Sequence, residues 1–379
     1  MDKEKEMTAL NASVGADAGQ SLVCTDTTIT DPDADFNHYF LEQQRLLQRM
    51  MDPSYLKTVT MTELYEKVEL TPPSIIEGLL MRGTYLLAGS PKVGKSFLVA
   101  QLAYHISTGT PLWGYSVRKG TVLYLALEDS FQRLQERSYR MFDTAENESL
   151  HFAIYAGQIG NGLDAQLKNF MQEHPDTSLI IIDTLQKVRE AGGEAYSYAS
   201  DYQIIGSLKQ FADSYGICMI LVHHTRKQQA DDRFDMISGT NGLMGAADGA
   251  FVLYKKNRTD NKAILDVAGR DQPEQRFNLI RNEETLVWEL ESVEKELWKV
   301  PPEPILDEVA KHITAESPDW QGTPTELVTL LGVDMKPNAL SQKLNVNASR
   351  LLNEYNIRMS SSRSHDGRRI TFHLEMPPA

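Results

Sequence analysis

The sequence contains little cysteine, because its 379 residues include only Cys24 and Cys218. Two cysteines this far apart suggest neither a disulfide framework nor a zinc site. No apolar run approaches the roughly 20 residues that a membrane-spanning helix needs. The first six residues, MDKEKE, lack the basic and apolar regions of a secretory signal. We therefore expect a chain of the reducing cytoplasm that has no membrane partner.

The chain also lacks an excess of basic residues. Its 38 Lys and Arg stand against 52 Asp and Glu, which gives a formal net charge of −14. This balance excludes a surface that attracts nucleic acid throughout, so any DNA contact must use local basic patches. The apolar fraction of 41% is ordinary for a soluble globular protein. A chain of this length can hold one large domain and a smaller one.

The segment from Gly89 to Ser96 fits the phosphate-binding pattern Gly-x4-Gly-Lys-Ser/Thr. It follows a short apolar run and leads into a helical pattern, which is the context that the motif requires. The glycines permit a backbone whose amides point at phosphates, and the helix adds its positive dipole end. The alternatives are an ordinary glycine-rich turn or a dinucleotide fingerprint, but Gly-x-Gly-x-x-Gly is absent. We expect nucleotide contacts from Gly89, Ser90, Pro91, Lys92, Val93, Gly94, Lys95, Ser96 and Phe97.

Apolar runs alternate with helical patterns through the middle of the chain. Continuous apolar runs, such as those at 121–127 and 178–183, are typical of parallel strands covered on both faces. The alternation predicts an α/β fold with a doubly wound, mostly parallel sheet. Later short strands are expected to form an antiparallel edge of this sheet, at residues 251–254, 263–267, 276–280 and 286–290.

Three expected strands end in polar residues, at Glu128, Asp183 and His224. Ligands of parallel sheets bind beyond the carboxyl ends of the strands. Asp183 is suited to hold Mg²⁺ together with Ser96 or through water, and Lys95 can reach the β- and γ-phosphates. Glu128 is suited to orient the attacking water, and His224 to sense the γ-phosphate. The alternative for a single acid at a strand end is a helix cap, as at Asp129-Ser130.

Together these motifs, including Leu-Val-His-His224-Thr-Arg-Lys, resemble the RecA-type ATPases, and within them the RepA-like group of plasmid and mobile-element replicative helicases. The resemblance covers about residues 70–290. It implies ATP and Mg²⁺ as cofactors, Glu128 as the catalytic glutamate and Asp183 as the metal-site aspartate. It also implies a ring with nucleotide sites at subunit boundaries, such as a hexamer, in which a neighbour's arginine stabilises the transition state. Arg270 is our choice for that arginine; the alternatives are Arg258, Lys256 or a plain surface role for Arg270.

Two long segments follow Asp183 and His224, and the resemblance implies that they line a central channel. Loops this long in a compact domain are usually functional or disordered. Their glycines, basic residues and tyrosines suit a flexible grip on single-stranded DNA. Acidic residues in the second segment, Asp231, Asp232 and Asp235, oppose that interpretation. The expected DNA contacts in the two segments are Lys187, Arg189, Arg226, Lys227 and Arg233.

The two ends of the chain differ in composition from its middle. Residues 1–35 have the composition of a disordered acidic tail. Residues 36–70 form a helical arm that packs on a neighbouring subunit or on its own core, and the ATPase domain spans 71–298. A linker at 299–304 precedes residues 305–376, whose three helices and Asp366-Gly367 hairpin signal predict a winged helix.

The winged-helix segment resembles small domains of phage and plasmid primase-helicases. It is locally basic, which suits duplex DNA, and the alternative is a winged helix that docks on protein. Its basic residues are Lys343, Arg350, Arg358, Arg363, Arg368 and Arg369.

The sequence thus predicts an ATP-hydrolysing DNA motor, a helicase of a plasmid, phage or integrative element. Two alternatives remain. One is a recombination or repair ATPase without unwinding activity. The other is an ATP-switched DNA-binding regulator that uses the winged helix.

Overall fold

A computed structural model describes residues 52, 54–189, 198–225, 233–237, 241–257, 259–295, 301–364 and 367–375. The chain divides into two compact units, residues 1–67 and 68–379. In the first unit, helix α2 (Met61–Glu66) begins after Thr60, whose hydroxyl and backbone form a capping box with Glu63. This confirms the short helix expected around Thr62. The expected acidic tail (1–35) and the helix at 36–51 lie outside the described residues.

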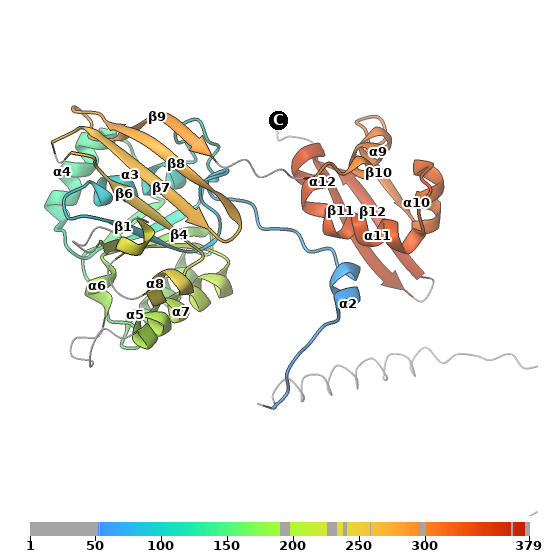
Figure 1. Ribbon diagram of the computed structural model, residues 1–379, viewed down its shortest axis with the longest axis horizontal. Helices are drawn as coiled ribbons and strands as arrows, with labels where there is room; N and C mark the ends of the chain where they lie inside the picture. Colours follow the sequence, from blue (N-terminus) through green and yellow to red (C-terminus); the bar gives the residue numbers. More distant parts are fainter. Residues whose placement is uncertain are drawn as a thin grey trace, which may run out of the picture. The chain divides into compact units, whose positions relative to one another are not determined.

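Residues 83–295 are organised around one nine-stranded sheet, with the strand order β3-β2-β4-β5-β1-β6-β7-β8-β9 (Figure 1). The first six strands in this order are parallel to one another. The α/β fold with a large, mostly parallel sheet is therefore confirmed. The strands are β1 (Gly83–Gly89), β2 (Thr121–Ala126), β3 (Leu150–Ala153), β4 (Thr177–Asp183), β5 (Cys218–His224), β6 (Gly249–Tyr254), β7 (Lys262–Gly269), β8 (Gln272–Arg281) and β9 (Trp288–Lys295).

Two hydrophobic clusters form on the two faces of this sheet, since successive side chains of a strand point in opposite directions. One cluster joins β1, β2 and β4 to helices α3 (Lys95–Thr108) and α4 (Phe131–Phe142). The other joins the opposite sides of the same strands to the remaining helices. These are α5 (Leu163–Glu173), α6 (Leu185–Val188), α7 (Tyr198–Tyr215) and α8 (Asn241–Ala246), with a 3₁₀ turn η1 (Phe234–Met236) before α8.

One expectation about the sheet was wrong. Strand β6, expected within the antiparallel edge, pairs parallel with β1, and Leu86 lies opposite Ala250. The reason lies in the connection, because η1 and α8 carry the chain back across the sheet between β5 and β6. Parallel neighbours need such a crossover. Strands β7, β8 and β9 then follow in antiparallel pairs, as expected.

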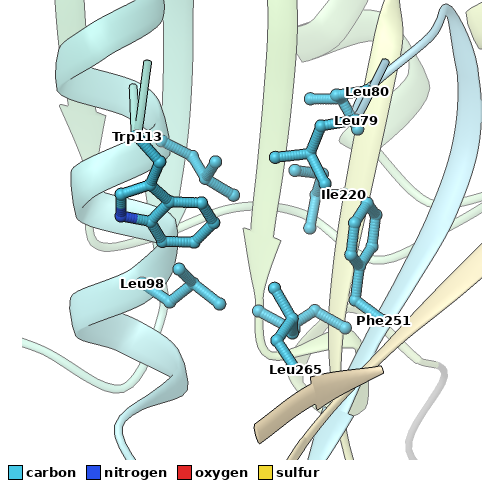
Figure 2. A pocket seen from close by; sticks show the side chains of 9 residues that line it. Leu79, Leu80, Leu98, Trp113, Ile220, Phe251 and Leu265 are labelled. Atoms are coloured by element: carbon cyan, nitrogen blue, oxygen red, sulfur yellow. The ribbon is translucent and has the colours of Figure 1, made fainter. Parts of the chain in front are cut away.

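The core beneath α3 contains a small cavity of about 10 Å³, lined by apolar side chains of α3, the sheet and the loop carrying Trp113. Figure 2 shows Leu98, Trp113 and Phe251 converging on it. This volume is about that of a single water-sized probe, so the cavity is a packing defect and not a ligand site. Within the described ranges, no helix has both the length and the apolar character required to cross a membrane.

The C-terminal segment forms four helices and a three-stranded antiparallel sheet of order β10-β12-β11 around its own apolar cluster. Its elements are α9 (Pro304–His312), β10 (Asp319–Gly322), α10 (Pro324–Leu331), α11 (Pro337–Val346), α12 (Ala348–Tyr355), β11 (Ile357–Ser364) and β12 (Gly367–Leu374). Residues 337–355 form two helices, α11 and α12, which meet at Asn347, so the segment has four helices where three were expected. The expected linker ends earlier than 304, because Pro304 is the first residue of α9.

Candidate nucleotide site

The parallel register brings the carboxyl ends of four strands together. Gly89 of β1 lies opposite His224 of β5, and Asp183 of β4 lies opposite both Val222 of β5 and Ala126 of β2. Glu128 follows Ala126 by two residues. The phosphate loop and all three expected strand-end residues therefore lie together at the carboxyl ends of the parallel strands, as their positions in the sequence predicted.

The loop has the backbone that its glycines were expected to permit. Gly94, the residue before α3, has a φ of +112°, and Lys92 at the tip has a φ of +66°. The Lys95 side chain folds back over the loop. Its amino group donates to the Gly89 carbonyl at 2.7 Å and the Ser90 carbonyl at 3.2 Å, and lies 3.4 Å from His224 Nδ1.

Burial lowers the pKa of Lys95 to about 8, an effect that the nearby Asp183 and Glu128 carboxylates partly oppose. Burial also lowers the pKa of His224, and the positive charge of Lys95 lowers it further. A phosphate group placed between these two side chains would raise the pKa of Lys95 again, since an opposite charge at short range favours the charged form.

Asp183 is buried at the end of β4, and its Oδ2 accepts a hydrogen bond of 2.9 Å from Tyr124 Oη. Burial raises its pKa, while hydrogen bonds from Ser96 and Tyr124 act in the opposite direction. Ser96 and Asp183 thus present two neighbouring oxygens. Mg²⁺ is typically bound by one or two carboxylates together with substrate phosphates, so this pair fits a nucleotide-bound Mg²⁺. Within the described residues, no cluster of three or more His, Cys, Asp or Glu side chains is placed to hold a metal ion.

Glu128 is exposed, and its Oε1 lies 3.5 Å from the Thr184 hydroxyl. The neighbouring acid has a different part. Asp129 pairs with Arg137 at 2.8 Å, while the Ser130 hydroxyl caps α4 by accepting from the Arg133 amide. The cap is therefore Ser130, and the carboxylate of Glu128 is left facing the site.

Arg270 lies at the opposite end of the sheet, near the amino-terminal ends of the parallel strands. It follows Gly269, which pairs with Gly249 at the start of β6, and it donates to the Gly245 carbonyl at 2.9 Å. It is therefore far from the phosphate loop of its own chain. Lys256 is exposed just after β6, at the same end of the sheet as the phosphate loop. Arg258 lies outside the described residues.

The expected DNA contacts after the strands have different environments. Lys187 is exposed on α6, and the Arg233 guanidinium stacks on the Tyr254 ring at 3.7 Å. Arg189 is a correction, because it is buried and pairs with the buried Asp201 of α7 at 2.5 Å. A guanidinium held in this way does not face a DNA backbone. Arg226 and Lys227 lie outside the described residues.

The C-terminal basic residues also differ from one another. Three of them form ion pairs: Lys343 with Glu303, Arg350 with Glu354, and Arg358 with Glu375. Arg368 is partly buried and Arg369 is exposed, both on β12. The local positive charge is thus smaller than the composition of this segment suggested.

Sequence reasoning missed two residues that support the site. Tyr124 is fully buried in β2, and Trp288 of β9 lies behind the loop with its backbone held by Gln101 of α3. Neither belongs to a motif. Tyr124 is one apolar residue in a buried run, and only the strand pairing reveals that its hydroxyl reaches Asp183.

A family model described as an AAA domain matches residues 51–230. The DNA repair protein RadA of Streptococcus pyogenes serotype M6 is 27% identical over 171 residues, which are 45% of this chain and 33% of RadA. RadA of Streptococcus pneumoniae matches equally over 35% of its length. The match thus spans about a third of these relatives.

Two solved structures are also similar, each at 17% identity. One is an ATPase domain with a TM-score of 0.47, and the match covers 70% of this chain and 99% of that domain. A DnaB-like replicative helicase has a TM-score of 0.49, with coverage of 68% and 75% respectively. Both TM-scores lie below 0.5.

The loop, the shared strand edge and the matched AAA domain define a P-loop ATPase. The chain is also similar to RadA over 171 residues, and it carries a RecA-type P-loop ATPase domain.

Proposed function

We propose that this protein is an ATP-driven DNA motor that works as a ring, of the RepA-like replicative helicase kind found in plasmids, phages or integrative elements. The observation that carries the proposal is the separation of two functional groups in one subunit. Lys95, Glu128 and Asp183 lie at the carboxyl ends of the parallel strands, and Arg270 lies at the opposite end of the sheet. A head-to-tail assembly would bring Arg270 of one subunit to the nucleotide of the next, and such an interface closes into a ring if its rotation permits.

Each residue at the loop has a role in hydrolysis that its position supports. Glu128 orients the attacking water and accepts its proton. Lys95 leaves the loop carbonyls and contacts the β- and γ-phosphates. Ser96 and Asp183 would hold Mg²⁺, which would neutralise the charge that develops on the phosphates during hydrolysis.

His224 adjoins both Lys95 and the segment after β5. The next residue, Thr225, donates to the Gly89 carbonyl at 3.4 Å and forms a bridge with Ile237. A change at the γ-phosphate therefore has a short route to the segment containing Arg233. We assign single-stranded DNA contact to this segment and to Lys187.

The C-terminal segment supports a second DNA contact. A helix, a strand, two further helices and helix α12 precede the hairpin β11–β12, and this order supports a winged helix with one helix more than the three expected. We propose domains at 71–298 and 305–376, with Arg368 and Arg369 on the wing facing duplex DNA. The remaining C-terminal cations contribute mainly to folding through their ion pairs.

The similarity to RadA favours a second candidate, a DNA repair ATPase without unwinding activity. A measured strand separation distinguishes it from the motor. An ATP-switched regulator differs from both, because it would bind duplex DNA by sequence and hydrolyse ATP at a rate that single strands barely change.

The test measures ATP hydrolysis with and without single-stranded DNA, and the mass of the ATP-bound assembly. Stimulation by single strands that is lost in Lys95→Ala and Glu128→Gln, together with a ring-sized mass, supports the motor. A subunit-mixing experiment tests Arg270. Lys95→Ala and Arg270→Ala subunits are each inactive alone, and mixing them restores activity, because one interface in the mixed ring has both groups intact. No recovery in rings shown to be mixed would contradict a role for Arg270 across the boundary.

A further inference from the structure

Phe97, the residue after Ser96 in the first turn of α3, carries two cations on its ring. The Arg281 guanidinium of β8 lies 4.0 Å from the ring centroid, and that of Arg137 on α4 lies 5.1 Å away. Three elements far apart in the sequence therefore meet at the start of the phosphate-loop helix. Phe97 is only partly buried, so this group borders solvent.

The positive charge at this place exceeds what the fold neutralises. Arg137 pairs with Asp129, but Arg140 beside it is held by the carbonyls of Glu283 and Glu284, both at 2.8 Å. Arg281 donates to the Leu286 carbonyl at 3.3 Å. Within the part of the chain that the structure describes, neither Arg140 nor Arg281 forms an ion pair. Burial and the two neighbouring arginines lower the pKa of Arg281, which indicates that the cluster repels itself.

An anion with a flat aromatic part suits such a cluster, because arginine stacks on π faces and pairs with phosphate. Open space lies next to Arg140. A groove of about 610 Å³ runs between α3, α4 and the turn from β8 to β9, and it is lined by Arg140, Tyr104, Tyr139 and Thr285 but by none of Phe97, Arg137 and Arg281.

The proposed ATPase function, on which this step rests, fixes the direction of the nucleotide. Lys95, Asp183 and Glu128 hold the γ-phosphate end. The amides of the loop and the first helical turn hold the α- and β-phosphates. The nucleoside then extends past the first turn of α3, away from the carboxyl ends of the strands. Phe97 lies on that side.

We propose that Phe97, Arg281 and Arg137 form the platform for the nucleobase and its sugar. Arg281 packs on Phe97 and lies 5.8 Å from the centroid of the Trp288 ring, and the base stacks on the guanidinium surface that these two rings leave open. Arg137 supports the Phe97 ring from α4. Stacking reads the π face of a base rather than its hydrogen-bonding edge. The site therefore takes purine nucleoside triphosphates as a class, and ATP and GTP have similar KM values.

The test compares ATP with Mg²⁺-tripolyphosphate, which has the phosphates but no base. Arg281→Ala raises the KM for ATP and for GTP about tenfold, as expected for loss of one base stack. It leaves the inhibition constant of tripolyphosphate and the kcat unchanged. Arg281→Lys keeps the charge without the planar face and does not restore the KM. Phe97→Leu shows the same pattern, and Arg118→Ala, at an exposed arginine elsewhere, changes nothing.

Three outcomes would overturn the platform. The KM for ATP could stay unchanged in folded Arg281→Ala, the inhibition constant of tripolyphosphate could rise in parallel with it, or the variant could alter assembly mass alone and so mark a subunit contact. Failure of the proposed function looks different, because then neither ATP nor tripolyphosphate binds the parent protein. Thermal unfolding of each variant shows whether it folds.

Discussion

Trp288 and Gly94, 194 positions apart in the chain, touch behind the phosphate loop. The indole Nε1 donates to the Gly94 carbonyl at 3.4 Å, and a Cβ on Gly94 would lie 2.7 Å from the indole ring. Trp288 is itself held by Gln101, whose amide donates to its carbonyl and accepts from its backbone amide. Strand β9, in the antiparallel part of the sheet, thus supports the phosphate loop that follows the parallel strand β1.

Gly94→Ala is expected to destabilise the protein by about 2 kcal/mol or more, because the new methyl group meets the indole and the left-handed backbone is strained. It is also expected to abolish ATP binding. The matched control is Gly206→Ala in α7, where a Cβ meets nothing within 4 Å. That change should stabilise the helix by roughly 0.5–1 kcal/mol. Urea unfolding and ATP titration measure both, and equal stability of the two variants would contradict the contact.

Tyr124→Phe is expected to weaken Mg²⁺ activation about tenfold, the lower end of effects seen for residues that orient metal ligands. The hydroxyl lost is one of the donors that hold the pKa of Asp183 down against burial. The acid limb of the pH–rate profile should therefore move to higher pH. Hydrolysis is measured against Mg²⁺ concentration, and the exposed Tyr215→Phe is the control. An unchanged Mg²⁺ dependence would remove Tyr124 from the site.

The sequence predicts the central strands and the loop edge well, for a physical reason. The strand β4 is covered on both faces, so its residues 179–182 are all apolar and the polar Asp183 at its end stands out. The direction of β6 leaves no such mark, because a buried strand has the same composition in either direction. Its direction depends on α8, a six-residue helix containing Gly242 and Gly245 that periodicity does not reveal.

Single side chains whose partners are distant are equally hidden. Arg189 stands in a segment rich in glycine and basic residues, which indicates a flexible loop. Its carboxylate partner, Asp201, is on the next helix, and only the folded chain shows that the two are buried together. Trp288 gives no signal either, because its contact with Gly94 depends on how β9 joins the sheet.

Arg189 and Lys187, two residues apart, are expected to respond in opposite ways. Arg189→Ala removes one partner of the buried ion pair with Asp201, a loss that costs roughly 3–5 kcal/mol. Lys187→Ala removes an exposed charge, so it should leave the thermal midpoint unchanged and weaken single-stranded DNA binding. The slope of the logarithm of the DNA-binding constant against the logarithm of salt concentration should also become less negative by about 0.7. Unfolding curves and DNA titrations at several salt concentrations separate the two, and a stable Arg189→Ala variant with weakened DNA binding would reverse the assignment.

Lys95→Met is expected to abolish hydrolysis and to change how stability depends on pH. The folded pKa of Lys95 is about 8, below its ordinary value, so the unfolded chain binds more protons at higher pH. The parent therefore gains stability as pH rises from about 8 towards 10, the range between the folded and unfolded pKa values. Methionine does not titrate, so the stability of the variant relative to the parent falls over that interval. Thermal midpoints of both proteins without nucleotide, from pH 7 to pH 10, measure this difference. Lys187→Met, at an exposed lysine, controls for general effects of charge. If the stability difference between the parent and Lys95→Met stayed constant with pH, burial would not lower the pKa of Lys95. Its amino group would then be fully charged before any phosphate binds.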